Sequence, residues 1–460
     1  MILEDAVAVA TQELDAIRIE KEIPGIACGL MKEGKLVYSF GLGETLLGNQ
    51  SPPTADSIFR IASMSKSFTA QAILLLRDRG ALKLEDLITS YLPWTGTIGL
   101  PADSAPITIR DLLTMGAGLP TDDPWGDRQE YLPLPDFDAL VGAGLTFNRK
   151  VNTGFEYSNL GYALLGRIIS AVSGQPYETF MKREIQDPLG MTTSTYFSDL
   201  VPESLRAHGY AKFESGVVPE PTTSNGAFTP MGGLHSSVKE LALWVSMFQT
   251  GKSEAQNPYR LVQSVLAKEQ GEIAERIITS SYGYGLYIDE DATLGRFVSH
   301  SGGYPGFGSH MRWHRESGWG IIGLANLTYA PMVPTCSKIM NQIVHLYKKS
   351  NKPKVILGHA TQEAFAVVNG LFNTWNNEIC DRWFTENMDL DQPRQERSSA
   401  LEKITSGLTG WTVLADSLTA PTLSFAKWKV QSGEVMIEVE MLMSPEKSPR
   451  IQKLTFKTST

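Results

Sequence analysis

Three short strings in this sequence could together carry out acyl transfer through a serine nucleophile. In chain order they are Ser63-Met64-Ser65-Lys66, Tyr157-Ser158-Asn159 and His300-Ser301-Gly302. They supply a hydroxyl nucleophile, two groups that could take its proton, and a strand edge that could hold an acyl oxygen. Ser-x-x-Lys alone is a weak signal, because it occurs four times, at Ser63, Ser236, Ser424 and Ser444. The context of each string therefore decides which one can do chemistry.

The first string is followed directly by a predicted apolar helix. Residues 68–76 are apolar nearly all round, which is typical of a buried helix, and Gly80 fits its end. Ser63 is then expected at or near the helix N-terminus, with Lys66 one turn further on the same face. The partial positive charge of that N-terminus would favour negative charge developing beside Ser63. The alternative is that Ser63 only caps the helix and Lys66 is solvated.

The other three Ser-x-x-Lys strings have weaker contexts. Ser236 precedes a second helical segment, residues 238–248, and we expect it to act as a helix cap. Ser424 and Ser444 lie in strand-like and turn-like segments. We therefore assign the nucleophile to Ser63.

A serine hydroxyl needs a neighbouring base, and two candidates are present. Lys66 can serve only if its pKa falls from about 10.4 toward 7, which corresponds to roughly 4 kcal/mol and is an effect that burial can produce. Tyr157 is the second candidate, because an adjacent ammonium would pull down the pKa of its phenol. The two groups would titrate as a unit. Asn159 could orient Lys66 or a substrate amide; alternatively, Tyr157 is a loop tyrosine that caps the next helix and Asn159 lies in a turn.

The third string follows a strand-like segment, residues 296–299. Gly302 and Gly303 would let a substrate approach the strand edge, and the Gly303 N–H could face an acyl oxygen. Together with the Ser63 N–H it would form an oxyanion hole. The alternative is a glycine-rich turn in which His300 is incidental.

Other catalytic patterns are missing from the sequence. No G-x-S-x-G, H-E-x-x-H, P-loop or paired-cysteine string occurs. His310 and His314 would lie roughly 13 Å apart on a strand, too far to share an ion. We therefore expect neither a metal nor a cofactor.

The elements that must position these strings predict an α+β fold. A helix over residues 4–20 and a hairpin over 26–40 come first, and the middle, about 65–260, is mainly helical. Strands at 284–288, 308–313 and 320–325 and a helix at 337–347 then return. This order indicates an antiparallel sheet flanked by helices plus a mainly helical region.

A basic, polar segment, residues 348–354, is the best candidate for a linker. It divides the chain into a hydrolase domain, 1–350, and a smaller α+β domain, 355–460, of unknown role. In the second domain we expect a long helix over 361–387 and strands near 425–430, 435–443 and 451–457.

Composition limits the partners and the location. A net charge of −9 argues against nucleic-acid binding, and no apolar run is long enough to span a bilayer. The N-terminus lacks the basic flank of a signal peptide, and the three cysteines lack CxxC pairing. We therefore expect a cytoplasmic protein. The expected partners are a small ester or amide substrate and, as one alternative, further copies of the chain in a homo-oligomer.

The order Ser-x-x-Lys, Tyr-x-Asn, His-x-Gly resembles the serine β-lactamase and penicillin-binding-protein superfamily, in particular its class C β-lactamase-like branch. That branch includes DD-peptidases, D-aminopeptidases and carboxylesterases, and the resemblance covers roughly residues 5–348. It implies that Ser63 is acylated, that Lys66 and Tyr157 are the general acid/base pair, and that Asn159 orients them. It also implies an oxyanion hole formed by the N–H groups of Ser63 and Gly303.

The sequence departs from this family at two places. His300 stands where β-lactamases usually have the lysine of Lys-Thr-Gly, which helps to bind the antibiotic carboxylate. Because histidine is mostly neutral at pH 7, efficient β-lactamase activity is not expected. The second departure is Met115-Gly116-Ala117-Gly118, where relatives often have His/Thr-Thr-Ser-Gly.

These observations predict a serine hydrolase that forms an acyl-enzyme on a small ester. The alternatives are a D-amino-acid peptidase or amidase, or a DD-peptidase-like enzyme, and a non-catalytic protein whose residues 355–460 bind a partner. An acidic loop could receive a substrate amine, but we favour the interpretation of a solvated loop; its acids are Asp122, Asp123 and Asp127.

Overall fold

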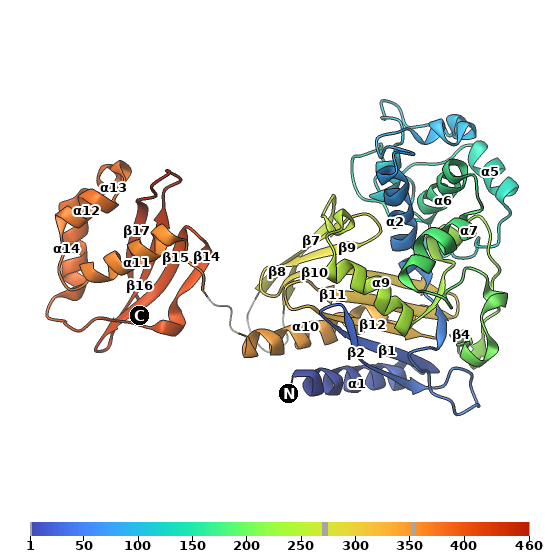
Figure 1. The fold of residues 1–460 in the computed structure, drawn as a ribbon, viewed down its shortest axis with the longest axis horizontal. Helices are drawn as coiled ribbons and strands as arrows, with labels where there is room; N and C mark the ends of the chain where they lie inside the picture. The colour runs from blue at the N-terminus through green and yellow to red at the C-terminus, as the bar shows by residue number, and fades with distance from the viewer. Residues whose placement is uncertain (1, 269–274, 352–354, 460) are drawn as a thin grey trace. The chain divides into compact units, whose positions relative to one another are not determined.

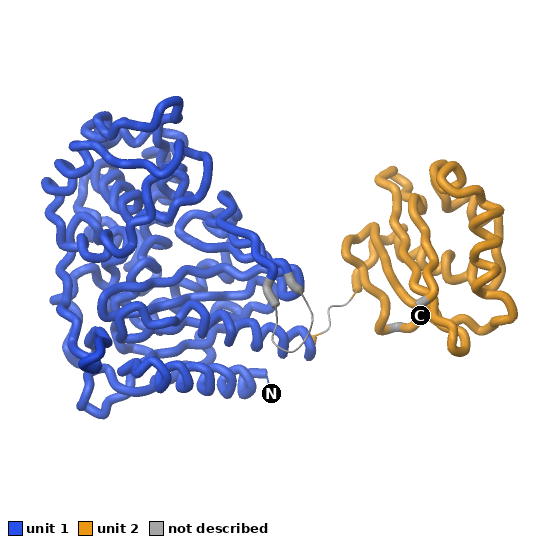
Figure 2. The backbone as a smooth tube through the Cα atoms, turned by 180° about the vertical axis from the view of Figure 1, so that it is seen from behind, with its two compact units in different colours: residues 1–350 blue, residues 351–460 orange. Residues whose placement is uncertain are grey.

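The computed structural model describes residues 2–268, 275–351 and 355–459. The chain divides into two compact units, Met1–Ser350 and Asn351–Thr460 (Figure 2). Within the described part of the chain, none of the helices combines the length and the apolar character that crossing a bilayer requires.

An eight-stranded antiparallel sheet forms the centre of the first unit (Figure 1). Its strand order is β2-β1-β12-β11-β10-β9-β8-β7. The strands are β1 Gly25–Lys32, β2 Lys35–Gly43, β7 Arg260–Lys268, β8 Glu275–Tyr282, β9 Tyr287–Asp291, β10 Gly295–Tyr304, β11 Phe307–His314 and β12 Trp319–Ala325. The N-terminal hairpin joins the C-terminal strands through β1 and β12, with Cys28 opposite Gly323. The predicted α+β class is therefore confirmed.

Helices cover both faces of this sheet, because both faces carry apolar side chains. In strand β1, for example, alternate side chains belong to two different hydrophobic cores. Ile26, Cys28 and Leu30 pack with α1 Ile2–Lys21 and α10 Met332–Ser350. Ala27 and Met31 belong to the opposite core, which includes side chains of α9 Val238–Thr250.

The helical region is built around α2, α6 and α8, which pack against one another. Its helices are α2 Ser65–Asp78, α3 Ile109–Leu113, α4 Asp123–Gly126, α5 Leu134–Gly142, α6 Asn159–Ser173, α7 Tyr177–Met181 and α8 Thr229–Gly232. Two short antiparallel strand pairs complete the unit: β3 Ile58–Arg60 with β6 His235–Ser237, and β4 Tyr210–Phe213 with β5 Gly216–Pro219. The β3–β6 pair brings the segment before Ser63 next to the segment before α9.

Two details of the first unit differ from the sequence expectations. The strand expected at 284–288 begins only at Tyr287. Gly285 lies in the turn between β8 and β9 and has a left-handed φ of +70°, which is incompatible with an extended strand at that residue. The hairpin of β7 and β8 extends the sheet by two strands in a region for which the sequence analysis predicted no strands.

The second unit is a smaller sheet with helices. Strand order is β13-β15-β16-β17, and β14 pairs with β15. Its elements are α11 His359–Leu371, α12 Asn377–Trp383, α13 Glu386–Asp391, α14 Arg394–Thr405, β13 Thr412–Val413, β14 Thr419–Thr422, β15 Phe425–Ser432, β16 Val435–Met443 and β17 Ile451–Ser459. Alternate strand residues such as Trp428, Val430 and Ile437 form a core with Val368 of α11.

The single helix predicted over residues 361–387 is wrong. Helix α11 ends at Leu371, and a new helix starts where the Asn376 side chain accepts the N–H groups of Glu378 at 2.8 Å and Ile379 at 3.3 Å. An asparagine cap satisfies N–H groups that have no partner within the helix, and it therefore favours a helix start at this position.

Candidate active site

Ser63 lies in a 3₁₀ turn, Ala62–Met64, that leads directly into α2. Ala62 has a φ of +48°, a conformation that is strained for a residue with a side chain. The surrounding elements hold this turn: Ile61 donates its N–H to the Leu234 carbonyl at 2.9 Å, and Ser65 Oγ donates to the Ala62 carbonyl at 2.7 Å. The strained backbone conformation is thus that of Ala62, the residue directly before Ser63. Ser63 itself is 8% exposed.

The Lys66 amine is fully buried and has three oxygen partners. Its Nζ lies 2.8 Å from Ser63 Oγ, 2.6 Å from Asn159 Oδ1 and 2.9 Å from the Met231 carbonyl. Two of these partners are pure acceptors, while the Ser63 hydroxyl can also donate. The arrangement therefore satisfies both an ammonium, which donates three bonds, and a neutral amine, which donates two and accepts one.

Burial lowers the pKa of Lys66 to about 8. Four carboxylates oppose this effect and raise it: Asp123, Asp127, Asp122 and Glu130. At pH 7 roughly a tenth of such amines would be neutral. This direction agrees with what the sequence analysis required of a base.

Tyr157 lies beside the amine, but its acidity is the reverse of the expectation. Its ring centroid is 4.9 Å from Lys66 Nζ. Burial raises the pKa of the phenol well above its usual value, with Asp123 and Tyr287 adding to the rise and a hydrogen bond with Ser63 opposing it. The expected pull of an ammonium on the phenol is therefore wrong, since the loss of hydration outweighs it. Tyr157 is a neutral hydrogen-bonding group here, and Lys66 is the stronger candidate for the base.

Asn159 is the first residue of α6 and is held from two sides. Its Nδ2 donates to Asp123 Oδ1 at 2.8 Å, which leaves Oδ1 to accept from Lys66. Ser158, not Tyr157, caps this helix, because its side chain accepts the Gly161 N–H at 3.1 Å.

The acidic loop belongs to the site, and the solvated interpretation is wrong for two of its acids. Asp122 accepts the N–H groups of Asn159 at 2.7 Å and Leu160 at 2.8 Å, at the start of α6. Asp127 is 3% exposed and accepts a hydrogen bond from Tyr329 at 2.9 Å. Burial raises the pKa of Asp127 to about 7. The carboxyl groups of this loop therefore lie close enough to Lys66 to affect its pKa.

His300, Gly302 and Gly303 lie inside strand β10, so the interpretation as a glycine-rich turn is wrong. Strand β9 pairs with β10 only between Gly295 and Ser299, which leaves the next residues of that edge without a β9 partner. Gly302 packs so closely on the Ser63 turn that an added Cβ would clash with the Ile61 carbonyl. The absence of a side chain is what allows this strand to lie beside the turn that carries Ser63.

His300 is buried and neutral. Its Nε2 lies 3.0 Å from the Tyr282 hydroxyl and its Nδ1 lies 2.7 Å from the Ser301 carbonyl. Burial, together with the charge of Lys66, lowers the pKa of His300 to about 3. The position that carries a cation in Lys-Thr-Gly sequences therefore carries no charge in this protein.

Sequence reasoning missed the Met231 carbonyl as a partner of Lys66. A backbone carbonyl leaves no signature in residue types, and only the packing of α8 against α2 brings it to the amine.

Comparison with known proteins shows the family of the chain. Residues 7–342 match the family model described as Beta-lactamase. Penicillin-binding protein 4* of Bacillus subtilis (strain 168) is 31% identical over 307 residues, which are 64% of this chain and 66% of that protein. Protein flp of Staphylococcus aureus (strain COL) is 27% identical over 79% of this chain and 72% of that protein.

Two solved structures share the fold. The octameric penicillin-binding protein homologue from Pyrococcus abyssi has a TM-score of 0.62 and 21% identity, over 98% of this chain and 95% of that one. The β-lactamase/D-alanine carboxypeptidase from Yersinia pestis, complexed with citrate, has a TM-score of 0.57 and 22% identity, over 74% of this chain and 98% of that one. The match to the family model supports a serine hydrolase acting on amide or ester bonds, and by that match the chain belongs to the beta-lactamase family.

Proposed function

We propose that this protein is a serine hydrolase that forms an acyl-enzyme at Ser63 and acts on small, uncharged esters. The observation that carries the proposal is the set of contacts around Lys66. A neutral amine in this position has two acceptors for its N–H groups, Asn159 Oδ1 and the Met231 carbonyl, and a lone pair facing the Ser63 hydroxyl at 2.8 Å. These are the requirements of a general base poised on a nucleophile.

The proposed reaction follows from this geometry. Lys66 takes the Ser63 proton while Oγ bonds to the substrate carbonyl carbon, and the negative oxygen is stabilised by the N–H groups of Ser63 and Gly303. Collapse of the intermediate breaks the bond to the leaving group, which receives the proton from Lys66, with the neutral Tyr157 phenol donating a hydrogen bond nearby. Water then attacks the acyl carbon while Lys66 takes a proton from the water, and the bond between the acyl carbon and Ser63 Oγ breaks. Ser63 Oγ receives the proton from Lys66, and the carboxylic acid leaves.

The charges around the site favour an uncharged acyl donor over one with a carboxylate. His300 is neutral, and the carboxylates Asp122, Asp123 and Asp127 lie near Lys66. A substrate carboxylate would lose hydration without gaining a cation at the His300 position. Penicillins and D-alanyl-D-alanine peptides carry such a carboxylate, and we therefore place an esterase ahead of a DD-peptidase.

A second candidate, an amidase or peptidase for amine-bearing D-amino-acid substrates, has one observation in its favour. Asp127 is buried, and it lies close enough to raise the pKa of Lys66. A substrate ammonium would be attracted by this carboxylate. Asp127→Asn separates the two functions, because it should weaken the turnover of D-alanine p-nitroanilide more than that of p-nitrophenyl butyrate.

The test is intact-protein mass spectrometry after treatment with a fluorophosphonate, with Ser63→Ala and Ser236→Ala as a matched pair. We expect one adduct in the wild type and in Ser236→Ala, and none in Ser63→Ala. A folded wild type without an adduct would overturn the proposal and favour a ligand-binding or partner-binding protein. With labelling established, rates on p-nitrophenyl butyrate, D-alanine p-nitroanilide and nitrocefin rank ester, amide and β-lactam.

Three further expectations stay predictions: a cytoplasmic location, self-association, and a role for residues 355–460. Light scattering of the purified chain measures its oligomeric state. The same measurement on residues 1–350 and on the full chain shows whether the second unit contributes to it.

A further inference from the structure

The loop that carries Tyr157 is held on both sides by a single residue, Met115. Glu156 donates its N–H to the Met115 carbonyl at 2.9 Å, and Ser158 donates its N–H to the Met115 sulfur at 3.3 Å. Because these two donors flank Tyr157 in the chain, the position of Met115 fixes the backbone from which the phenol projects. Met115 itself has a φ of +57°, and such a conformation persists only where neighbouring contacts impose it.

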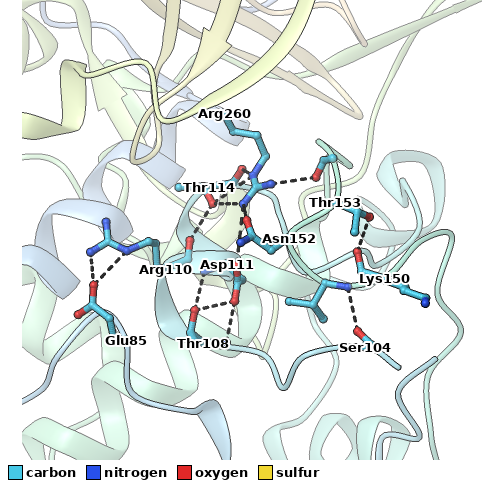
Figure 3. Close-up of polar contacts among 12 residues, drawn as sticks. Glu85, Ser104, Thr108, Arg110, Asp111, Thr114, Lys150, Asn152, Thr153 and Arg260 are labelled. Carbon is cyan, nitrogen blue, oxygen red and sulfur yellow. Dashed lines mark hydrogen bonds and ion pairs between the residues drawn. The ribbon is translucent and has the colours of Figure 1, made fainter. Parts of the chain in front are cut away.

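Arg260, on strand β7, binds the residue before Met115 and the loop that leads to Tyr157 (Figure 3). Its Nε donates to the carbonyl of Thr114, the residue before Met115, at 3.1 Å, and Nη2 donates to Asn152 Oδ1 at 2.7 Å. A weaker contact joins Nη1 to the Gly154 carbonyl at 3.4 Å. One planar guanidinium therefore connects the turn after α3 with the loop that leads to Tyr157, which is a role suited to arginine and not to lysine.

Gly116 provides the space that this guanidinium occupies. A Cβ at Gly116 would overlap the Arg260 head group, and no left-handed conformation requires glycine there. The Gly116 carbonyl also accepts the N–H of Asn152 at 2.7 Å, which is a second link between the two loops. The small residue at position 116 is thus matched to the Arg260 side chain.

We propose that Arg260, acting through the Thr114–Gly116 turn, is a positioning residue for Tyr157. The inference rests on the proposed function, because it assumes that Tyr157 assists the reaction at Ser63. Arg260 lies on a strand of the sheet, whereas Tyr157 precedes a helix of the helical region. The contact therefore aligns the Tyr157 side of the site with the side formed by the sheet.

The test is a double-mutant cycle between Arg260→Gln and Tyr157→Phe, with the rate of fluorophosphonate labelling at Ser63 as the readout. We expect Arg260→Gln to slow labelling about tenfold or more in the wild-type background and less than twofold in Tyr157→Phe. Arg260→Lys should not restore the rate, since it keeps the charge and loses the planar fork. In ester turnover, kcat per titrated site should fall while KM stays within about threefold.

Matched controls separate positioning from general destabilisation. Arg206 also donates to two backbone carbonyls, Ser198 at 2.9 Å and Val201 at 2.8 Å, so Arg206→Gln removes a comparable clamp elsewhere. Gly116→Ala should reproduce the Arg260→Gln defect, whereas Gly96→Ala, with open space around it, should not. If Arg260→Gln does not fold, Gly116→Ala and Met115→Leu replace it in the cycle.

Each outcome decides the question. An equal loss in both backgrounds, or no loss in the wild-type background, overturns the role of Arg260 while the proposed function stands. A wild type that does not label at Ser63 overturns the proposed function, and the inference with it. Loss confined to the background that retains Tyr157 supports the inference.

Discussion

The pairs Ser63/Lys66 and Ser236/Lys239 have the same spacing, and in both the serine precedes a helix and the lysine is its second residue. Their lysines nevertheless lie in opposite environments. The Lys66 side chain is fully buried, whereas that of Lys239 is 63% exposed and pairs with Asp56 at 2.9 Å. Burial lowers the pKa of Lys66 to about 8, and the hydrogen bond to Asp56 raises the pKa of Lys239. A motif thus becomes a candidate catalytic pair only where the fold removes the amine from water.

The two serines differ as well. Ser63 Oγ faces the Lys66 amine. Ser236 belongs to strand β6, and its Oγ lies 2.7 Å from Ser194 Oγ. The cap of α9 is Ser237, whose side chain accepts the Glu240 N–H at 3.3 Å. The expectation that Ser236 caps the helix is therefore wrong by one residue, because β6 extends through Ser237 in its pairing with β3.

The largest effect should separate the two lysines. We expect Lys66→Met to slow acylation by about 10²–10⁴, since it removes the base, and Lys239→Met to change it less than twofold. Rates of fluorophosphonate labelling on both variants measure this. Equal rates in Lys66→Met and the wild type would remove the distinction between the pairs.

The pH dependence of acylation should come next in size. If neutral Lys66 is the base, the rate rises with pH through about 8 and falls roughly tenfold per unit below it. From pH 8, where half of the amines are neutral, to pH 6 the loss would be about 50-fold. His300, whose pKa is about 3, should not contribute in this range, so His300→Gln should keep the same profile. A flat profile would contradict the assignment of the base.

The lowered pKa of Lys66 should also make the unfolding free energy depend on pH. The pKa of Lys66 is about 8 in the folded protein and near its ordinary 10.5 when unfolded. Between these values the unfolded state binds more protons, so stability rises with pH. From pH 8 to pH 9.5 we expect the unfolding free energy to rise by about 2 kcal/mol more in the wild type than in Lys66→Met. Urea titrations at the two pH values test this; parallel curves would show that Lys66 is not desolvated.

The smallest effect should concern the second pair. Ser236→Ala breaks a buried hydrogen bond, and Ser237→Ala removes a helix cap, each at a loss of about 1 kcal/mol. Neither should alter labelling at Ser63. Thermal unfolding combined with labelling tests this, and slower labelling in Ser236→Ala at full folding would show that the two pairs are coupled.

The sequence predicted the helices and strands that are determined by patterns of neighbouring residues. The apolar run 68–76 placed α2, the turn signal between two apolar segments placed β1, and alternation placed β15 and β16. It did not find β7 and β8, whose strand residues are largely polar or exposed. It also joined α11 and α12 into one helix, because the capping effect of Asn376 depends on which apolar face each segment buries.

The candidate site was predictable in residue types and not in their energetics. Ser63, Lys66 and Asn159 could be chosen from spacing and context, and the structure brings them within hydrogen-bond distance. The direction of the pKa shift of Tyr157 could not be predicted from the sequence. It depends on burial and on Asp123, a residue 34 positions earlier in the chain. Contacts made through the backbone, such as the Met231 carbonyl, leave no trace in residue types.

The three contacts of Lys66 have a consequence for how a reaction cycle would proceed. The same heavy-atom positions suit the charged and the neutral amine, so a proton can leave the serine oxygen and return to it without any rotamer change. The protein dipoles are already oriented for both states, and little reorganisation energy accompanies the transfer. Such a site would be ready for the second half-reaction as soon as the first is complete.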